Sequence, residues 1–333
     1  MIKAIRFQNY KVLRDTTLPL GNFTLLLGPN GSGKSTAISA LQKVRTLEPR
    51  GPSQLIASAS TPPGQDVIIE VHWGEPHRAV LMARWMSQGP IAHAWSSSRA
   101  LSGPDQQTLW DEVNRSRVYS FDATQLAAPV LPQPEMTLGE RGEGLAGVLD
   151  RLRDQHPERF EALNAELARW LPEFDRVLFD TVQPGHKAIF LRDRSSQHRI
   201  PAWDLSQGTL LALAILTLAY LPDPPPIVGF EEPDRGLHPR LLRDVRDALY
   251  RLAYPKDYEE KRPPVQVIAT THSPYMVDLF RDHLDDIVIA EKRGNEAKFE
   301  PLARRSDLER VLHDAQLGEA WYTGVLGGVP TTE

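Results

Sequence analysis

Nine residues near the start of the chain, GPNGSGKST from Gly28 to Thr36, constrain the fold more than any other stretch. They fit the pattern G-x-x-x-x-G-K-[ST], which requires a buried strand before it and a helix after it. Both neighbours are present, because NFTLLL reads as a buried strand and STAISALQKVRTL has helical spacing. The pattern therefore predicts a strand–loop–helix unit within an α/β domain.

The residue types in this loop suit a phosphate chain. Glycines let the backbone curl so that its N–H groups point inward. Lys34 would reach the β- and γ-phosphates, and the Ser35 hydroxyl would hold Mg²⁺. We therefore predict that ATP and Mg²⁺ bind here, and the alternative is a glycine-rich turn with a structural role only. The predicted binding residues are Gly28, Pro29, Asn30, Gly31, Ser32, Gly33, Lys34, Ser35 and Thr36.

Two later strands also run into polar residues. PPIVGFEEP reads as a strand buried on both faces that ends in Glu231 and Glu232. Neighbouring strand residues point in opposite directions, so the two acids would have separate tasks. Glu231 would complete the Mg²⁺ shell, and Glu232 would activate the attacking water. In ATTHSP, His272 would hydrogen-bond the γ-phosphate. The alternatives are a solvated strand end and a structural histidine.

The stretch DLSQGTLLALAILTLAYL raises a further question. A small polar segment opens an apolar run long enough to be a buried helix. Ser206 and Gly208 at the N-terminus of this helix could simply cap it. Alternatively, the N–H groups there could face an anion.

The remaining chain divides into predicted segments. DVIIEVHW, HRAVLMARWM and IAHAWSSS favour an antiparallel meander, and two helices are expected over 143–155 and 157–171. RVLFDTVQ and KAIFLRD favour a hairpin, and the proline-rich segment 125–134 is expected to be irregular. We predict a single domain over 1–333, made of a nucleotide-binding core (1–48 and 203–300), an antiparallel β subdomain (66–120), an insert of helices and a hairpin (125–202), and a C-terminal helix and tail (301–333).

Cysteine content, net charge and apolar runs indicate in which cellular compartment we expect the protein. The chain of 333 residues has no cysteine and a net charge of −5, so disulfide frameworks are excluded and the whole chain is not basic. The start lacks the apolar core of a signal peptide, and the longest apolar run, Thr209 to Leu221, is too short to span a bilayer. We expect a cytoplasmic protein that does not contact a membrane.

In this order the motifs resemble those of ABC-type ATPase heads. FQNYKVLRDTTLPL precedes the phosphate loop, and LSQGT, GFEEPDRGLHP and THSP follow it. The likeness is greatest to the group that holds the RecF, SMC and overcoming-lysogenization-defect (OLD) families, and to bacterial AAA-family ATPases of phage-defence operons. It covers residues 1–40 and 203–275. The resemblance implies an α/β P-loop NTPase of ABC-ATPase head architecture, with a mixed or parallel core sheet, an antiparallel β subdomain and a helical signature subdomain.

The resemblance also implies how ATP is held. Such heads bind two ATP molecules between two subunits arranged head to tail, each gripped by one phosphate loop and capped by the other subunit's signature. Ser206 and the N–H groups near Gly208 would then meet the γ-phosphate of the partner's ATP. Asp234 would lie in the loop that crosses the dimer seam. Gln125 is the candidate for the family's glutamine loop, and a surface glutamine is the open alternative.

Two motifs depart from the family pattern. The signature more usually reads LSGGQ or LSGGE, where this chain has Gln207 and Thr209. The magnesium carboxylate is usually Asp, where this chain has Glu231. Both departures leave Ser206 and Gly208 in place.

We therefore expect an ATP-hydrolysing head that works as an ATP-gated homodimer, with a higher assembly left open. The resemblance implies a role in anti-phage defence. No sustained heptads lie between Thr36 and Leu205, so SMC-type arms are not expected. The short stretch after His272 favours a separately encoded effector, a nuclease or a toxin. The alternatives are a DNA-repair ATPase that binds DNA directly, a slow-turnover scaffold, and a transporter subunit, which LSQGT and EEPDRGLHP disfavour. Separately, the basic turn RDRSSQHR (192–199) could contact phosphates of DNA or RNA.

Overall fold

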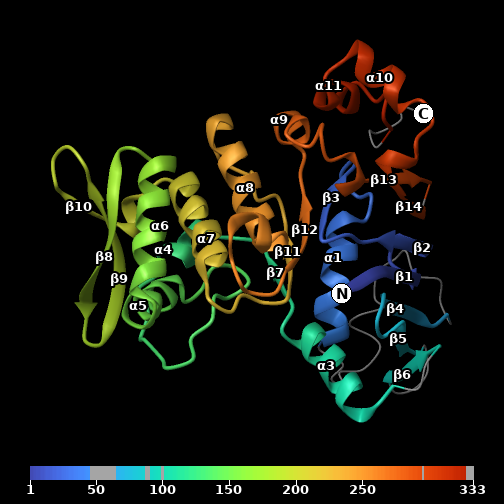
Figure 1. Cartoon of the computed structure of the whole chain (residues 1–333), viewed down its shortest axis with the longest axis horizontal. Helices are drawn as coiled ribbons and strands as arrows, with labels where there is room; N and C mark the ends of the chain where they lie inside the picture. Colours follow the sequence, from blue (N-terminus) through green and yellow to red (C-terminus); the bar gives the residue numbers. More distant parts are fainter. Residues whose placement is uncertain (46–64, 87–90, 99–100, 295, 328–333) are drawn as a thin grey trace. The chain divides into compact units, whose positions relative to one another are not determined.

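The computed structural model describes residues 1–45, 65–86, 91–98, 101–294 and 296–327. Contacts divide the chain into two compact units. The first takes in residues 1–118, 225–229 and 266–333, and the second takes in 119–224 and 230–265. Figure 1 shows the elements of both. The stretch EPRGPSQLIASASTPPGQ (48–65) has the proline, glycine and serine content that predicts a loop, and it lies outside the described residues, apart from Gln65.

The first unit contains a five-stranded antiparallel sheet in the order β2-β1-β4-β5-β6. In β4 and β5, alternate residues are buried, so one face of each strand packs on the core. This confirms the meander expected from three of these strands, which the two N-terminal strands extend. The strands are β1 (Ile2–Tyr10), β2 (Leu13–Pro19), β4 (Val67–Trp73), β5 (Ala79–Trp85) and β6 (Ile91–Ser97).

A six-stranded mixed sheet has the order β14-β13-β3-β12-β11-β7. β3 runs parallel to both β12 and β13, whereas β13 and β14 form an antiparallel pair. Every residue of β3, β11 and β12 is buried, as expected for strands covered on both faces. The strands are β3 (Phe23–Leu27), β7 (Arg117–Tyr119), β11 (Ile227–Phe230), β12 (Gln266–Thr270), β13 (Ile287–Arg293) and β14 (Glu296–Pro301).

Helix α1 (Lys34–Arg45) supplies apolar side chains to the core of the first unit. Ala37, Ile38, Leu41 and Val44 recur at helical spacing and are buried with residues of both sheets. The other helices of this unit are α3 (Gly103–Asn114), α9 (Pro274–Asp278), α10 (Leu308–Asp314) and α11 (Leu317–Tyr322).

The second unit is mostly helical. α7 (Gln207–Tyr220) is buried from its second residue to its last, which explains its uniform apolarity. The two expected helices and the hairpin are confirmed as α5, α6, β8 and β9. In Figure 1, α6 lies against this hairpin, and Phe160 packs on Phe179. The bounds are α4 (Ala123–Ala127), α5 (Leu145–Gln155), α6 (Pro157–Trp170), β8 (Phe174–Gln183), β9 (His186–Asp193), β10 (Arg199–Pro201) and α8 (Leu242–Ala253).

Short 3₁₀ helices connect several of these elements: η1 (Ala202–Asp204), η2 (Pro239–Leu241), η3 (Pro255–Tyr258), η4 (Leu284–Asp286) and η5 (Leu302–Arg304). Among the described residues, no helix has the length and apolarity needed to cross a membrane. The most apolar helix, α7, has 14 residues.

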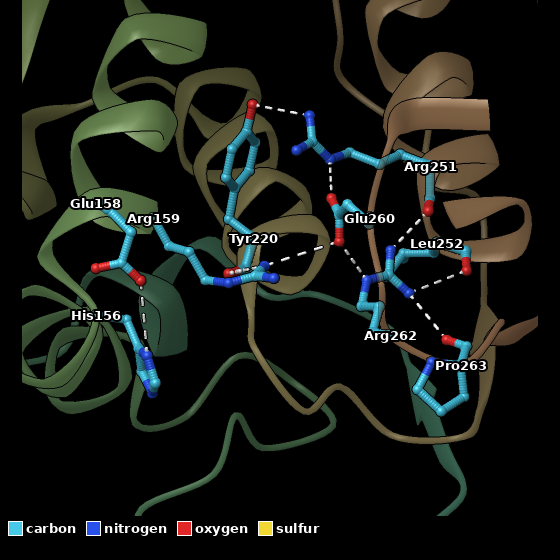
Figure 2. Close-up of polar contacts among 9 residues, drawn as sticks. All are labelled: His156, Glu158, Arg159, Tyr220, Arg251, Leu252, Glu260, Arg262 and Pro263. Carbon is cyan, nitrogen blue, oxygen red and sulfur yellow. Dashed lines mark hydrogen bonds and ion pairs between the residues drawn. The ribbon is translucent and has the colours of Figure 1, made fainter. Parts of the chain in front are cut away.

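A buried carboxylate joins three helices of the second unit. Glu260 is 7% exposed and follows α8, and its Oε2 accepts a hydrogen bond of 2.7 Å from Nε of Arg262, which is 4% exposed. Its Oε1 accepts from Nε of Arg251 on α8, and Nη1 of Arg159 on α6 lies 3.8 Å from Oε2. Figure 2 shows these side chains converging on the carboxylate.

The arginines around Glu260 bind other groups as well. Arg251 donates to the hydroxyl of Tyr220, the last residue of α7, over 3.1 Å. Arg262 donates to the backbone oxygens of Arg251 and Leu252. Burial lowers the pKa of Arg262, and Glu260 opposes that shift. Without the carboxylate, a buried guanidinium would lose its counter-ion.

We predict that Glu260→Gln lowers the free energy of unfolding by about 3 kcal/mol, because it removes that counter-ion. Urea unfolding followed by circular dichroism measures the loss. Glu259→Gln is the matched control, because it removes the same charge from an exposed neighbour and should change stability by less than about 0.5 kcal/mol. Equal losses in both variants would contradict a structural role for the network.

Candidate nucleotide-binding site

The phosphate loop joins β3 to α1, as the motif predicts, and glycine is required at two of its positions. A Cβ atom on Gly28 would lie 2.3 Å from the carbonyl oxygen of Ala290. Gly33 has a φ of +89°, and its Cβ would lie 2.8 Å from a methyl group of Leu13. Side chains at either position would push the loop away from the strands that flank it.

Lys34 lies at the first turn of α1 and is 5% exposed. Its Nζ donates to the carbonyl oxygens of Gly28 and Pro29, over 2.7 and 2.9 Å. The ammonium group is therefore held against the opening residues of the loop. This is the position from which a lysine reaches the β- and γ-phosphates of a nucleotide.

The loop also contains an unsatisfied hydroxyl. Ser32 is fully buried, and no hydrogen-bond partner for its Oγ occurs among the described residues. Buried hydroxyl groups nearly always have a partner, so this one fits a missing ligand oxygen. Asn30, Gly31 and Ser35 are exposed, whereas Pro29 and Thr36 are half-buried. The loop can therefore accept a phosphate chain, with the Ser35 hydroxyl available for Mg²⁺.

His272 follows β12, the parallel neighbour of β3. Because Leu26 pairs with Thr270, the phosphate loop and the THSP turn leave the same edge of the sheet. Thr271 is buried and its hydroxyl accepts from the N–H of Ser273. The Ser273 hydroxyl in turn caps α9. His272, half-buried, is thus held in a turn that is anchored on both sides.

The two predicted carboxylates follow β11. The N–H of Glu231 donates to the carbonyl oxygen of Tyr119 over 2.9 Å, so Glu231 still belongs to the strand ladder. Glu232 has a φ of +48°, a conformation rare for a residue of this type. Both side chains are half-buried. Strained backbone of this kind tends to occur at functional sites.

Ser206 caps α7. Its Oγ accepts from the N–H of Thr209 over 3.1 Å and lies 2.8 Å from the Thr209 hydroxyl. The capping interpretation of this serine is therefore confirmed. Ser206 and Gln207 remain exposed, so contact with a phosphate from outside stays a prediction.

The tip of α7 packs on the loop that follows the carboxylates. A Cβ atom on Gly208 would lie 2.8 Å from the carbonyl oxygen of Gly236. Gly236 has a φ of +76°, and the backbone carbonyl oxygen of Asp234 accepts from the N–H of Leu237 over 3.2 Å, in the turn before α8. The signature and the predicted seam loop therefore form one structural element of the second unit.

Gln125 lies in α4, where its backbone N–H donates to the Asp122 carboxylate over 3.1 Å. This hydrogen bond, with help from Arg141, lowers the pKa of Asp122. The Gln125 side chain is half-buried. Its role as a glutamine loop stays a prediction.

The predicted site residues thus fall into two sets. The phosphate loop and His272 belong to the first unit, whereas Glu231 and the other predicted residues belong to the second. Among the described residues, no cluster of three or more His, Asp or Glu side chains could hold a metal ion. This finding does not test the predicted Mg²⁺ ligands, because Ser35 and Glu231 together contain a single carboxylate.

Two results lay beyond sequence reasoning. Ala290 and Lys292 of β13 flank the phosphate loop, although no motif in the sequence marks them. The basic turn 192–199 is largely neutralised, because Arg192 pairs with Asp175 and Arg199 pairs with Asp180. That pairing does not favour nucleic-acid binding at this turn.

The chain has relatives among curated proteins and solved structures. It is 25% identical over 376 residues to an OLD nuclease of Thermus scotoductus (strain ATCC 700910 / SA-01), a match that covers 96% of this chain and 68% of the relative.

Among solved structures, an SMC head bound to the C-terminal winged-helix domain of ScpA matches with a TM-score of 0.61 and 18% identity, over 90% of this chain and 97% of the other. An SMC head with an extended coiled coil bound to the C-terminal domain of ScpA, derived from Pyrococcus furiosus, has a TM-score of 0.62 and 15% identity, over 94% and 98%. The SMC head domain from Thermotoga maritima has a TM-score of 0.52 and 16% identity, over 90% and 98%. At these identities the likeness shows the fold, which is that of an ABC-type ATPase head.

A family model described as "AAA domain, putative AbiEii toxin, Type IV TA system" matches residues 23–278, well over half of the chain and from β3 to the end of α9. The match includes the phosphate loop from Gly28, both carboxylates and His272. The chain belongs to this AAA-domain family. It is similar in sequence to an OLD nuclease and in fold to SMC heads.

Proposed function

We propose that the protein binds and hydrolyses ATP and works as a head-to-tail dimer that ATP closes. The observation that supports this most is the phosphate loop itself. Lys34 is held against the loop by two carbonyl oxygens, and the buried hydroxyl of Ser32 has no partner among the described residues. A triphosphate would satisfy that hydroxyl and take up the charge of the ammonium group.

The residues expected to contact phosphate, Mg²⁺ or the attacking water each have a chemical task in this proposal. The loop N–H groups and Lys34 bind the β- and γ-phosphates. Ser35 and Glu231 would hold Mg²⁺, which neutralises charge on the phosphates when bound. Glu232 accepts a proton from the attacking water, and His272 donates to the γ-phosphate.

The exposed tip of α7 supports a site completed by a second copy. A serine hydroxyl has one proton to donate and two positions to accept. The cap uses one acceptor position, and the Thr209 hydroxyl can donate to the other. The Ser206 proton then remains for a γ-phosphate that approaches from the partner subunit. The positive end of α7 favours such an anion.

Packing of Gly208 on Gly236 supports a link between the two sites of the dimer. The loop that contains Asp234 follows the water-activating Glu232 and touches the tip that serves the partner's ATP. Loss of the γ-phosphate next to Glu232 would therefore alter the dimer interface, because the loop after Glu232 packs on the tip of α7. ATP binding closes the dimer and hydrolysis releases it.

We further propose a regulatory role in anti-phage defence, with a separately encoded nuclease or toxin as effector. Support comes from the family description, which mentions a toxin of type IV toxin–antitoxin systems, and from the relative named an OLD nuclease. Affinity purification of the tagged protein from its native host, with ATP present, should recover the effector. A Lys34→Ala variant is the control that separates ATP-dependent capture from background.

We predict that Glu232→Gln traps an ATP-bound dimer, because the amide cannot accept the proton of the attacking water. Light scattering coupled to size exclusion should show twice the monomer mass with ATP and Mg²⁺, and the monomer mass without them. Adding Lys34→Ala to this variant should return the monomer. If the mass of Glu232→Gln is the same with and without ATP, the gated dimer is wrong.

Substitutions at Ser206 can separate capping from phosphate contact. Aspartate and asparagine both cap helices as well as serine does, so both variants should keep α7 stable. We predict that Ser206→Asp abolishes ATP-driven dimerisation, because its carboxylate repels the γ-phosphate. Ser206→Asn should retain most of it. Loss in both variants, or in neither, would argue against an anion at this tip.

Mixing two inactive variants tests whether the site is shared. A dimer of one Lys34→Ala subunit and one Ser206→Asp subunit contains one intact site if the tip acts in trans. Statistical mixing should then restore up to about a quarter of the wild-type ATPase rate. No recovery would be expected if each subunit completed its own site.

A further inference from the structure

Strand β13 extends beyond the end of β3 and continues beside the phosphate loop. Ile287 pairs with Leu25 and Ile289 with Leu27, in parallel register. β3 ends at Leu27, and the chain then turns into the loop, whereas β13 continues to Arg293. The last residues of β13 therefore lie along one side of the loop.

Alternate residues of β13 face the loop. Ala290 lies against Gly28, and Nζ of Lys292 lies 3.9 Å from the place that a Cβ atom of Gly31 would occupy. Glu291, between them, points to the opposite side of the strand. Its carboxylate accepts a hydrogen bond of 2.9 Å from Arg293 and would contact a Cβ atom on Gly327. Lys292 is thus the charged group that this strand brings to the loop.

Several positively charged groups lie at the phosphate loop. The ammonium group of Lys34, the inward N–H groups and the start of α1 are all positive. The exposed ammonium group of Lys292 adds to them, and among the described residues no ion pair or hydrogen bond involves it. Positive groups that converge in this way favour an anionic ligand.

Burial along the loop indicates which phosphate Lys292 would meet. Ser32 and Gly33 are buried and belong to the inner part of the loop, whose backbone N–H groups surround the α- and β-phosphates in loops of this type. Asn30 and Gly31 are exposed. The exposed tip next to Lys292 therefore lies toward the end of a phosphate chain.

We propose that Lys292 is a second phosphate-binding lysine, which contacts the γ-phosphate of ATP bound in its own subunit and makes the site prefer triphosphate to diphosphate. This proposal rests on the proposed ATP-binding function of the loop. A charge-assisted hydrogen bond from an exposed lysine to phosphate contributes about a tenfold gain in affinity.

The test measures binding of the non-hydrolysable ATP analogue adenylyl imidodiphosphate and of ADP, each with Mg²⁺, by isothermal titration calorimetry. Lys292→Gln should weaken the analogue about tenfold and change ADP by less than about twofold. Lys292→Arg should stay near the wild type. Lys298→Gln, which removes an exposed lysine from the same hairpin, should leave both affinities unchanged.

The outcomes separate this proposal from the one on which it rests. If the wild-type chain binds neither nucleotide, the proposed ATP-binding function fails. If the wild type binds both and Lys292→Gln weakens them equally or not at all, ATP binding stands and the γ-phosphate contact is overturned. A loss in Lys298→Gln as large as that in Lys292→Gln would also overturn it, because the effect would then be that of net charge. Circular dichroism of each variant confirms that the fold is kept.

Discussion

Contact between two backbones at Gly28 is the constraint on which the candidate site depends. The Ala290 carbonyl oxygen occupies the space that a side chain at this position would need. Parallel pairing of β13 with β3 holds that oxygen in place. The carbonyl oxygen of Gly28 itself accepts from Lys34, and Lys292, two residues after Ala290 on the same strand, approaches the loop at Gly31. A strand near the end of the chain therefore shapes a loop near its start.

A similar close approach organises the second unit. Gly208 lets the tip of α7 meet the backbone at Gly236, so the signature and the loop after Glu232 act as one element. Capping and phosphate contact at Ser206 are compatible, since the cap uses an acceptor position of the hydroxyl and a phosphate would use its proton. At the other end of this unit, Glu260 binds arginines of α6 and α8 next to the end of α7 (Figure 2).

Residue periodicity predicted much of the fold, and the helices that we missed begin at N-cap residues that the sequence also contains. The meander, the β8–β9 hairpin, α5 and α6 follow directly from periodicity. The predicted β subdomain (66–120) left the helix over 103–114 unassigned, although Ser102 and Asp105 form a capping box there. Gln125 begins the segment expected to be irregular but lies in α4, because Asp122 caps that short helix. The grouping of 1–48 with 203–300 as one core remains a prediction, since contacts divide the latter stretch between two units.

Sequence patterns were enough to predict the strand–loop–helix unit, the carboxylates after a buried strand and the capped apolar helix. Each depends on residues that are neighbours in the chain, so spacing and residue type are enough to predict them. Three features became visible in the folded chain alone: Ala290 and Lys292 lie beside the loop, Gly236 contacts Gly208, and three arginines surround Glu260. These contacts join residues far apart in the sequence, and their partners are chosen by strand register and helix packing, which no local pattern encodes.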